Sequence, residues 1–186
     1  IARHTNAFKI NEDVVIPLPR MGEYTDGIER INIELSTRNK LRLLDELDRV
    51  FDGPLLRGKA LDADADPFAA DELVTEHVRK ARAVIASARA RWQFLLDEID
   101  RPLSAARDRL AGLGLADVLA EADARIAADA AAGVAPQAAT RLFHLLQDRT
   151  IRVSWKREVR APLGEILHGQ VFAPVMKLCD DTHRRV

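Results

Sequence analysis

The residues best suited to chemistry lie at the start of the chain, where polar side chains recur on a segment that should be extended. Residues 8–17 predict a strand, because the run Val14–Ile16 is β-branched and Pro17 cannot donate to a β-ladder. Alternate residues of a strand share one face. The polar candidates on or before this face are Arg3, Thr5, Lys9, Asn11 and Asp13. They could bind a substrate carboxylate through charge-assisted hydrogen bonds, whereas spacing alone favours an edge strand whose polar residues prevent aggregation.

A second candidate is a metal site. Cys179 and His183 are four residues apart and would share one face of a helix, which makes half of a zinc site. No second pair completes it, so a buried structural cysteine is the preferred interpretation. Phosphate loops, dinucleotide glycine motifs, nucleophile elbows and HExxH motifs do not occur in the sequence. Local spacing therefore assembles no catalytic constellation.

Basic residues gather on the second of two predicted long helices. They are Arg79, Lys80, Arg82, Arg89 and Arg91. The acidic residues around them are Glu72, Glu76, Asp97 and Glu98. A basic helix face can meet nucleic acid, but the flanking carboxylates and the lack of interleaved aromatic residues favour an ion-paired, solvated surface. We expect no nucleic-acid partner.

The composition fits an ordinary globular chain. Of its 186 residues 31% are charged and 47% hydrophobic, and 28 basic against 29 acidic residues leave a formal net charge of -1. That balance gives no electrostatic argument for nucleic acid or an anionic membrane. The single cysteine excludes an internal disulfide framework and an iron–sulfur cluster held by this chain alone. Without an apolar run of about 20 residues or a secretion leader, no membrane span and a cytoplasmic setting are expected.

The elements that must position these side chains are mostly helical. A first helix should begin near Pro19 or Arg20 and stop at the run Asp52–Pro54. Its apolar stripe comprises Met21, Tyr24, Ile28, Ile31 and Leu35, slips over residues 36–40, and resumes at Leu44, Leu47 and Phe51. A second helix from about Phe68 to Asp100 carries a coiled-coil-like seam at Val74, Val78, Ala81, Ile85, Ala88, Trp92, Leu95 and Ile99. The two predict a long antiparallel hairpin.

Shorter helices should complete a mainly α fold with one short N-terminal strand. They are Leu103–Leu113, Leu115–Ala131, Pro136–Gln147, Pro162–Leu167 and Val171–Arg185, the last two interrupted near Gly169 and Pro174. The alternating segment Thr150–Trp155 suits a strand or a continued helix about equally well.

The run NAFKINEDVVIPLPRMGEYTDGIERINIEL, Asn6 to Leu35, resembles the start of the C-terminal part of FAD-linked oxidases of the glycolate oxidase and D-lactate dehydrogenase type. More closely, it is similar to the large bacterial flavin and iron–sulfur members that act on D-2-hydroxyacids such as D-2-hydroxyglutarate. The specific resemblance covers about the first 50 residues. A weaker one covers LHGQVFAPVMKLCDDTHRRV, which looks like the helix before the family's metal-binding loop. Residues 54–160 match the helical insertion of the large members.

The resemblance implies substrate contacts at the N-terminus. In the family, a Lys-x-Asp-x-x-x-Pro motif supplies a lysine that grips the substrate carboxylate. Counted back from Pro17, the family's aspartate falls on Asp13 and its lysine on Asn11. Lys9 lies two residues earlier on the same predicted strand face and could reach the same pocket. An arginine and a threonine of the relatives have counterparts in Arg3 and Thr5.

The resemblance also implies that this chain is a piece of a longer enzyme. The family's FAD-binding domain would precede it, its metal-binding loop would follow it, and the iron–sulfur cysteines are missing. We expect three regions: residues 1–53 of the oxidase C-terminal type, an insertion over 54–160, and C-terminal helices over 161–186. FAD, a divalent metal and iron–sulfur clusters are implied for the parent, and the chain alone is expected to be inactive. The alternative is a non-enzymatic helical module that docks a partner or forms a homodimer through the hairpin.

Overall fold

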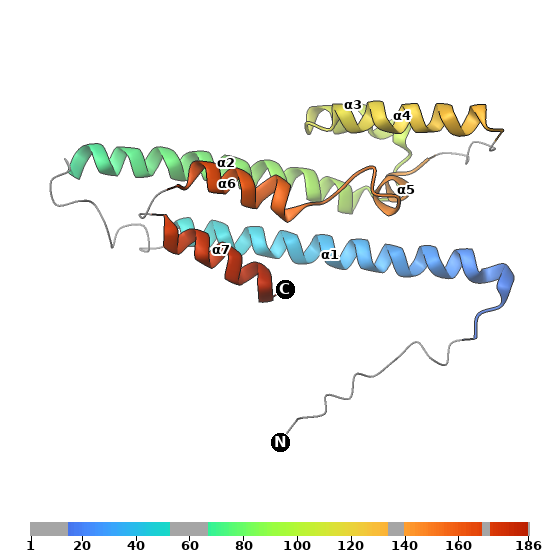
Figure 1. Cartoon of the computed structure of the whole chain (residues 1–186), viewed down its shortest axis with the longest axis horizontal. Coiled ribbons are helices and arrows are strands. Elements are labelled where there is room, and N and C mark those ends of the chain that lie inside the picture. The colour runs from blue at the N-terminus through green and yellow to red at the C-terminus, as the bar shows by residue number, and fades with distance from the viewer. Residues whose placement is uncertain (1–14, 53–66, 134–139, 169–171, 186) are drawn as a thin grey trace, which may run out of the picture.

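The chain folds as a mainly α structure built on a long antiparallel hairpin, as predicted (Figure 1). The computed structural model describes residues 15–52, 67–133, 140–168 and 172–185. Its helices are a 3₁₀ turn η1 (Leu18–Arg20), α1 (Met21–Asp52), α2 (Pro67–Asp97), α3 (Leu103–Gly112), α4 (Ala116–Ala131), α5 (Leu142–Gln147), a π turn η3 (Lys156–Arg160), α6 (Ala161–Ile166) and α7 (Ala173–Arg185). Most of the predicted strand, residues 8–14, lies outside the described residues, and residues 15–17 belong to no strand.

The hairpin positions the other elements. α1 and α2 run side by side in opposite directions; α6 lies along α2, and α7 lies against the second half of α1 (Figure 1). The first half of α1 extends beyond α7. At the far end of α2, the short helices α3, α4 and α5 pack together.

Two hydrophobic clusters hold this arrangement. The first, here called the hairpin cluster, joins α1, α2, η3, α6 and α7 and includes Leu43, Leu44, Leu47, Ala81, Ile85, Trp92, Val159, Leu163 and Cys179. The second joins the end of α2 to α3, α4 and α5 and includes Leu95, Ile99, Leu103, Leu110, Ala122, Leu142 and Leu145. Side chains from all three predicted regions thus meet in the hairpin cluster, and the region boundaries remain predictions.

The seam predicted on the second helix is confirmed as core. Its positions from Ala81 to Ile99 are all buried, at the 5% level of exposure or less. They face α1, α6 and the short helices of this same chain. The apolar residues of this seam are therefore buried by contacts within this chain.

The helix ends follow local backbone chemistry. Gly114 adopts φ 76° after α3, and the N–H of Leu115 donates to the carbonyl of Leu110, which is a Schellman-type stop. The wide turn η3 comes just before Pro162, which has no N–H and would crowd the carbonyl four residues back. A π turn, in which Ala161 N–H donates to Lys156 O, relieves that conflict without ending the helix.

Two helix predictions need correction. The segment Thr150–Trp155 forms neither a strand nor a continued helix: residues 150–154 are irregular and the next helix starts at Trp155. The helix predicted over Pro136–Gln147 begins only at Leu142. Thr140 and Arg141 are held instead to the α2–α3 turn, where Leu103 N–H donates to Thr140 O at 2.8 Å and Leu142 N–H to Arg101 O at 3.1 Å. Residues 134–139, including Pro136, lie outside the described residues.

None of the helices in the described ranges carries an apolar stretch long enough to cross a bilayer.

The hairpin cluster predicts a sharp difference between two leucines of α1. Leu44 is completely buried, whereas Leu35 is 51% exposed. We expect Leu44→Ala to lower the free energy of unfolding by about 2–5 kcal/mol, because it leaves a cavity in a packed core. The matched change Leu35→Ala should shift it by about 0.5 kcal/mol or less. Urea unfolding followed by circular dichroism measures both, and equal losses would contradict the assignment of the buried face.

Candidate functional site

The side chains predicted to bind a carboxylate are not placed by the structure. Arg3, Thr5, Lys9, Asn11 and Asp13 lie outside the described residues, and their role stays a prediction. The described chain begins at Val15, immediately after them, and leads through η1 into α1. The candidate site is therefore built from what α1 presents next to that segment.

The first half of α1 presents an exposed apolar stripe. Of the eight exposed large hydrophobic residues in the described ranges, seven lie between positions 15 and 35, namely Val15, Leu18, Met21, Tyr24, Ile28, Ile31 and Leu35. Residues Val15–Pro17, η1 and the first turns of α1 line a groove of about 430 Å³ on this side. A contiguous apolar surface of this kind marks a docking surface more often than an accident of sequence.

This stripe is not a continuation of the core face of α1. At about 100° per residue, Met21, Tyr24, Ile28, Ile31 and Leu35 centre about 150° away from the buried residues of the same helix. Those buried residues are Thr37, Leu43, Leu44, Leu47 and Phe51. The predicted slip over residues 36–40 is thus a change of face: one side of α1 packs on α2, and the apolar residues on the opposite side of its first half are exposed.

A mostly buried polar centre joins α2 to η3. Glu158 accepts hydrogen bonds from Arg91 Nη1 at 2.6 Å, from Trp92 Nε1 at 3.0 Å and from the backbone N–H of Ser154 at 2.7 Å. Arg91 also donates to the carbonyl of Leu113 at 3.2 Å. The centre satisfies donors from α2 and from the segment before η3 and also reaches the carbonyl of Leu113, so it ties η3 and the α3–α4 turn to α2.

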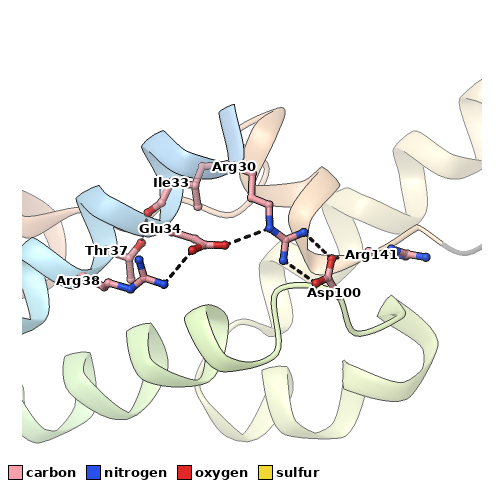
Figure 2. Close-up of polar contacts among 7 residues, drawn as sticks. All are labelled: Arg30, Ile33, Glu34, Thr37, Arg38, Asp100 and Arg141. Atoms are coloured by element: carbon pink, nitrogen blue, oxygen red, sulfur yellow. Dashed lines mark hydrogen bonds and ion pairs between the residues drawn. The ribbon is translucent and has the colours of Figure 1, made fainter. Parts of the chain in front are cut away.

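A second polar network ties α1 to the turn after α2 (Figure 2). Arg30 donates to Glu34 at 3.0 Å and to Asp100 at 2.8 Å, and Glu34 also accepts from Arg38 at 2.8 Å. The hydrogen bond from Arg30 holds the pKa of Asp100 below its usual value, against a smaller opposing effect of burial. Arg30 also lies over the Phe143 ring, 5.9 Å from its centroid. The network holds the first half of α1 against the turn after α2 and against α5.

The basic face of α2 is ion-paired, as predicted. Arg79 and Lys80 pair with Glu76 of the same helix. The other three basic residues reach further: Arg82 pairs with Asp52, Arg89 with Asp45 and Asp48, and Arg91 with Glu158. Most of the partners are carboxylates of α1, which sequence spacing on α2 alone did not indicate.

Cys179 is fully buried in the hairpin cluster, as predicted for a structural cysteine. Burial raises the pKa of its thiol to about 11. Within the described ranges, no three or more His, Cys, Asp or Glu side chains gather where they could hold a metal ion. The side chain of His183 is not among those described, so the pairing of Cys179 with His183, which the sequence did not favour as a metal site, is not tested.

Sequence reasoning missed Glu158 as the centre of a network. Its local signal is the pair Ser154 and Glu158, in which the serine Oγ accepts from Arg157 N–H at 3.3 Å and the glutamate accepts from the serine N–H. That reciprocal pattern marks a helix start. Its contacts to Arg91 and Trp92, more than 60 positions away, have no local signal.

Removal of Glu158 tests the structural role of the polar centre. Glu158→Ala leaves the Arg91 guanidinium mostly buried without a carboxylate, so we expect a loss of about 3–5 kcal/mol in unfolding free energy. Glu23→Ala, which removes the exposed partner of Arg20, should stay close to the wild type. Denaturant titration checks both. A small effect at Glu158 would show that water replaces it readily.

The buried thiol gives a reactivity prediction. At pH 8 we expect Cys179 of the folded chain to react with a disulfide reagent at least about 100-fold more slowly than in urea-unfolded chain, because burial disfavours the thiolate. The folded pKa exceeds the ordinary 9.0, so this thiol's contribution to stability is complete below pH 9 and is lost as the pH rises through about 11. Equal reaction rates in the two states would contradict the burial.

Comparison of this chain with known proteins found no relative. No family model matches the chain, no curated protein matches it, and no solved structure matches it. Any function for this chain therefore has to be argued from its own sequence and from the exposed stripe of α1.

Proposed function

We propose that this chain is a segment of an FAD-dependent D-2-hydroxyacid dehydrogenase of the D-lactate or D-2-hydroxyglutarate type. In the parent, hydride passes from the 2-hydroxy carbon to the flavin, which carries the redox chemistry. This chain contributes the helical insertion and, through its N-terminal polar residues, contacts to the substrate carboxylate. FAD, the metal and the iron–sulfur clusters are assigned to the rest of the parent, since the sequence offers neither a phosphate-binding loop nor a cysteine set for them.

The observation that carries the proposal is the exposed stripe of α1. It lies within Asn6–Leu35, the segment with the specific resemblance, and directly follows the predicted carboxylate-binding residues. An apolar face next to a substrate site needs a cover, and the remainder of the parent polypeptide is the cover that the resemblance implies. Gly27 lines the same groove with no atom within 4 Å of where its Cβ would be, so backbone could approach closely there.

The two faces of α1 are suited to two different contacts, one within this chain and one with the rest of the parent. The second half of α1 and the seam from Ala81 to Ile99 bury their apolar residues inside this chain, together with α6 and α7. The apolar residues on the opposite face of the first half of α1 are exposed. A segment that packs its own core on one side of α1 leaves the other side of that helix available to a catalytic domain.

The alternative is a non-enzymatic interaction or dimerisation module. Its specific support is the spacing of the stripe, whose steps of three and four residues from Met21 to Leu35 suit a helix–helix contact. Because the seam of α2 is used inside the chain, such a dimer would have to use this stripe. Two heptads fall short of the three to four that sustain a coiled coil, so the parent enzyme is the favoured partner.

Activity of the full-length parent tests the enzymatic proposal. We expect bound flavin and dye reduction that depends on D-lactate or D-2-hydroxyglutarate. Lys9→Ala should lower kcat/KM by about tenfold or more through loss of a charge-assisted contact. The control Lys177→Ala removes an exposed lysine of α7 and should leave kcat/KM unchanged. A parent without flavin, or without activity on any 2-hydroxyacid, would refute the assignment.

The stripe gives a prediction that separates the two proposals. In the 186-residue chain, Ile31→Asp should leave the melting temperature nearly unchanged, because Ile31 is already 53% exposed. In the parent the same change should lower it by several degrees, because a charge would then be buried. Ile126→Asp, at an exposed position of α4, should be neutral in both. If the isolated chain is instead a dimer in sedimentation and Ile31→Asp dissociates it, the interaction module is the correct interpretation.

A further inference from the structure

A second groove lies on the core side of α1, between that helix and the segment that follows α5. It has a volume of about 410 Å³, which is the size of a small-molecule site. Its charged residues are Lys40, Arg149, Arg152 and Glu29. Three cations against one carboxylate give the groove a net positive charge, in a chain whose overall charge is close to zero.

We propose that this groove binds a small organic anion, with a carboxylate or phosphate group held by Lys40, Arg149 and Arg152. This site is separate from the N-terminal residues assigned to the substrate carboxylate and does not depend on that assignment. Four observations support it: the groove cations have no ion-pair partner among the described residues, Lys40 is half-buried, Arg149 has a positive φ, and part of the lining is apolar.

The three cations of the groove have no ion-pair partner among the described residues. Elsewhere in the described ranges, the arginines of α2 and of the α1 network each meet a carboxylate. Neither Lys40, Arg149 nor Arg152 makes an ion pair with any described residue. The carboxylate of Glu158 attracts Lys40 but already accepts hydrogen bonds from Arg91, Trp92 and the backbone of Ser154.

Lys40 is half-buried in the groove. Its ammonium donates to Ser36 Oγ at 2.7 Å, one turn back on α1. Burial lowers the pKa of Lys40, and this effect outweighs the attraction of Glu158. A serine oxygen compensates little of that cost, whereas an anion in the groove would restore the interaction lost with water.

Arg149 occupies a backbone position that usually belongs to glycine. It follows the last turn of α5 with φ 66°, and it is the only non-glycine residue with positive φ in the described ranges. The turn is well ordered by hydrogen bonds: Asp148 accepts from Thr150 N–H at 2.8 Å, and Arg152 Nε donates to the carbonyl of Arg149 at 3.0 Å. This conformation places an arginine, and so a cation, where glycine would be unstrained, and strain of this kind often marks a functional position.

Part of the lining of the groove is apolar. Ile33 and Val153 line it half-buried, and Leu146 and Ile151 line it buried, beside the polar residues Asn32, Ser36, Thr37 and Gln147. A bare inorganic ion would leave the apolar side chains of the lining uncovered. The lining therefore suits an anion with a short hydrocarbon body better than a free ion.

Calorimetric titration of the 186-residue chain tests the proposal with three probes: inorganic phosphate, monobutyl phosphate and butyrate. Monobutyl phosphate and butyrate share the hydrocarbon body and differ in the anionic group, so their comparison identifies the preferred source. We expect one of the two to bind saturably, and more tightly than inorganic phosphate. Lys40→Gln and Arg149→Gly should each weaken that binding by about tenfold.

Two controls separate a site from general charge or misfolding. Arg42→Gln removes an exposed cation of the same helix that lies outside the groove and has no ion-pair partner among the described residues, so it should leave the dissociation constant unchanged. Arg149→Gly relieves the positive φ, so its melting temperature should equal or exceed the wild type while binding is lost. Absence of saturable binding by all three probes, or equal weakening in Arg42→Gln, would overturn the proposal.

Discussion

The packing of α1 against the seam of α2 is the constraint on which the rest of the structure depends. The seam from Ala81 to Ile99 is almost completely removed from water, and it is long enough to serve two clusters. One end receives α6 and α7, and the other receives the three short helices. Because this hydrophobic surface is shared, neither end of the hairpin can shift without exposing apolar side chains of the other.

Polar contacts then fix the register that apolar packing leaves loose. Glu158 binds Arg91 and Trp92 of α2 and the start of its own helix, so α6 meets the hairpin at one position. Arg160 of η3 donates two hydrogen bonds, at 2.6 and 3.0 Å, to Asp180 of α7 and so fixes α7 against η3. Arg30 and Asp100 tie the first half of α1 to the turn after α2. Each contact is directional, whereas leucines of equal size could slide past one another.

The sequence was informative where a regular pattern had a partner within the chain. The three-and-four spacing from Val74 to Ile99 predicted both the helix and its buried face, since the core that it needs is present here. The same spacing from Met21 to Leu35 predicted a helix correctly but not its environment. Periodicity shows that a face is apolar and cannot show what covers it. Thr150–Trp155 misled because Ile151 packs from an irregular segment and Trp155 packs from the first residue of the next helix.

The polar centre and the charged groove were harder to predict because their parts are distant in sequence. The contacts of Glu158 and the cations around Lys40 come together only through the fold, so no local motif announces them. α1 makes the reason plain: within 32 residues it carries a core face, a bare apolar stripe on the opposite side and one wall of a charged groove. A helix serving only this chain needs the first of these. The exposed apolar stripe and the charged groove are not needed for a stable fold, and features of this kind commonly mark binding surfaces.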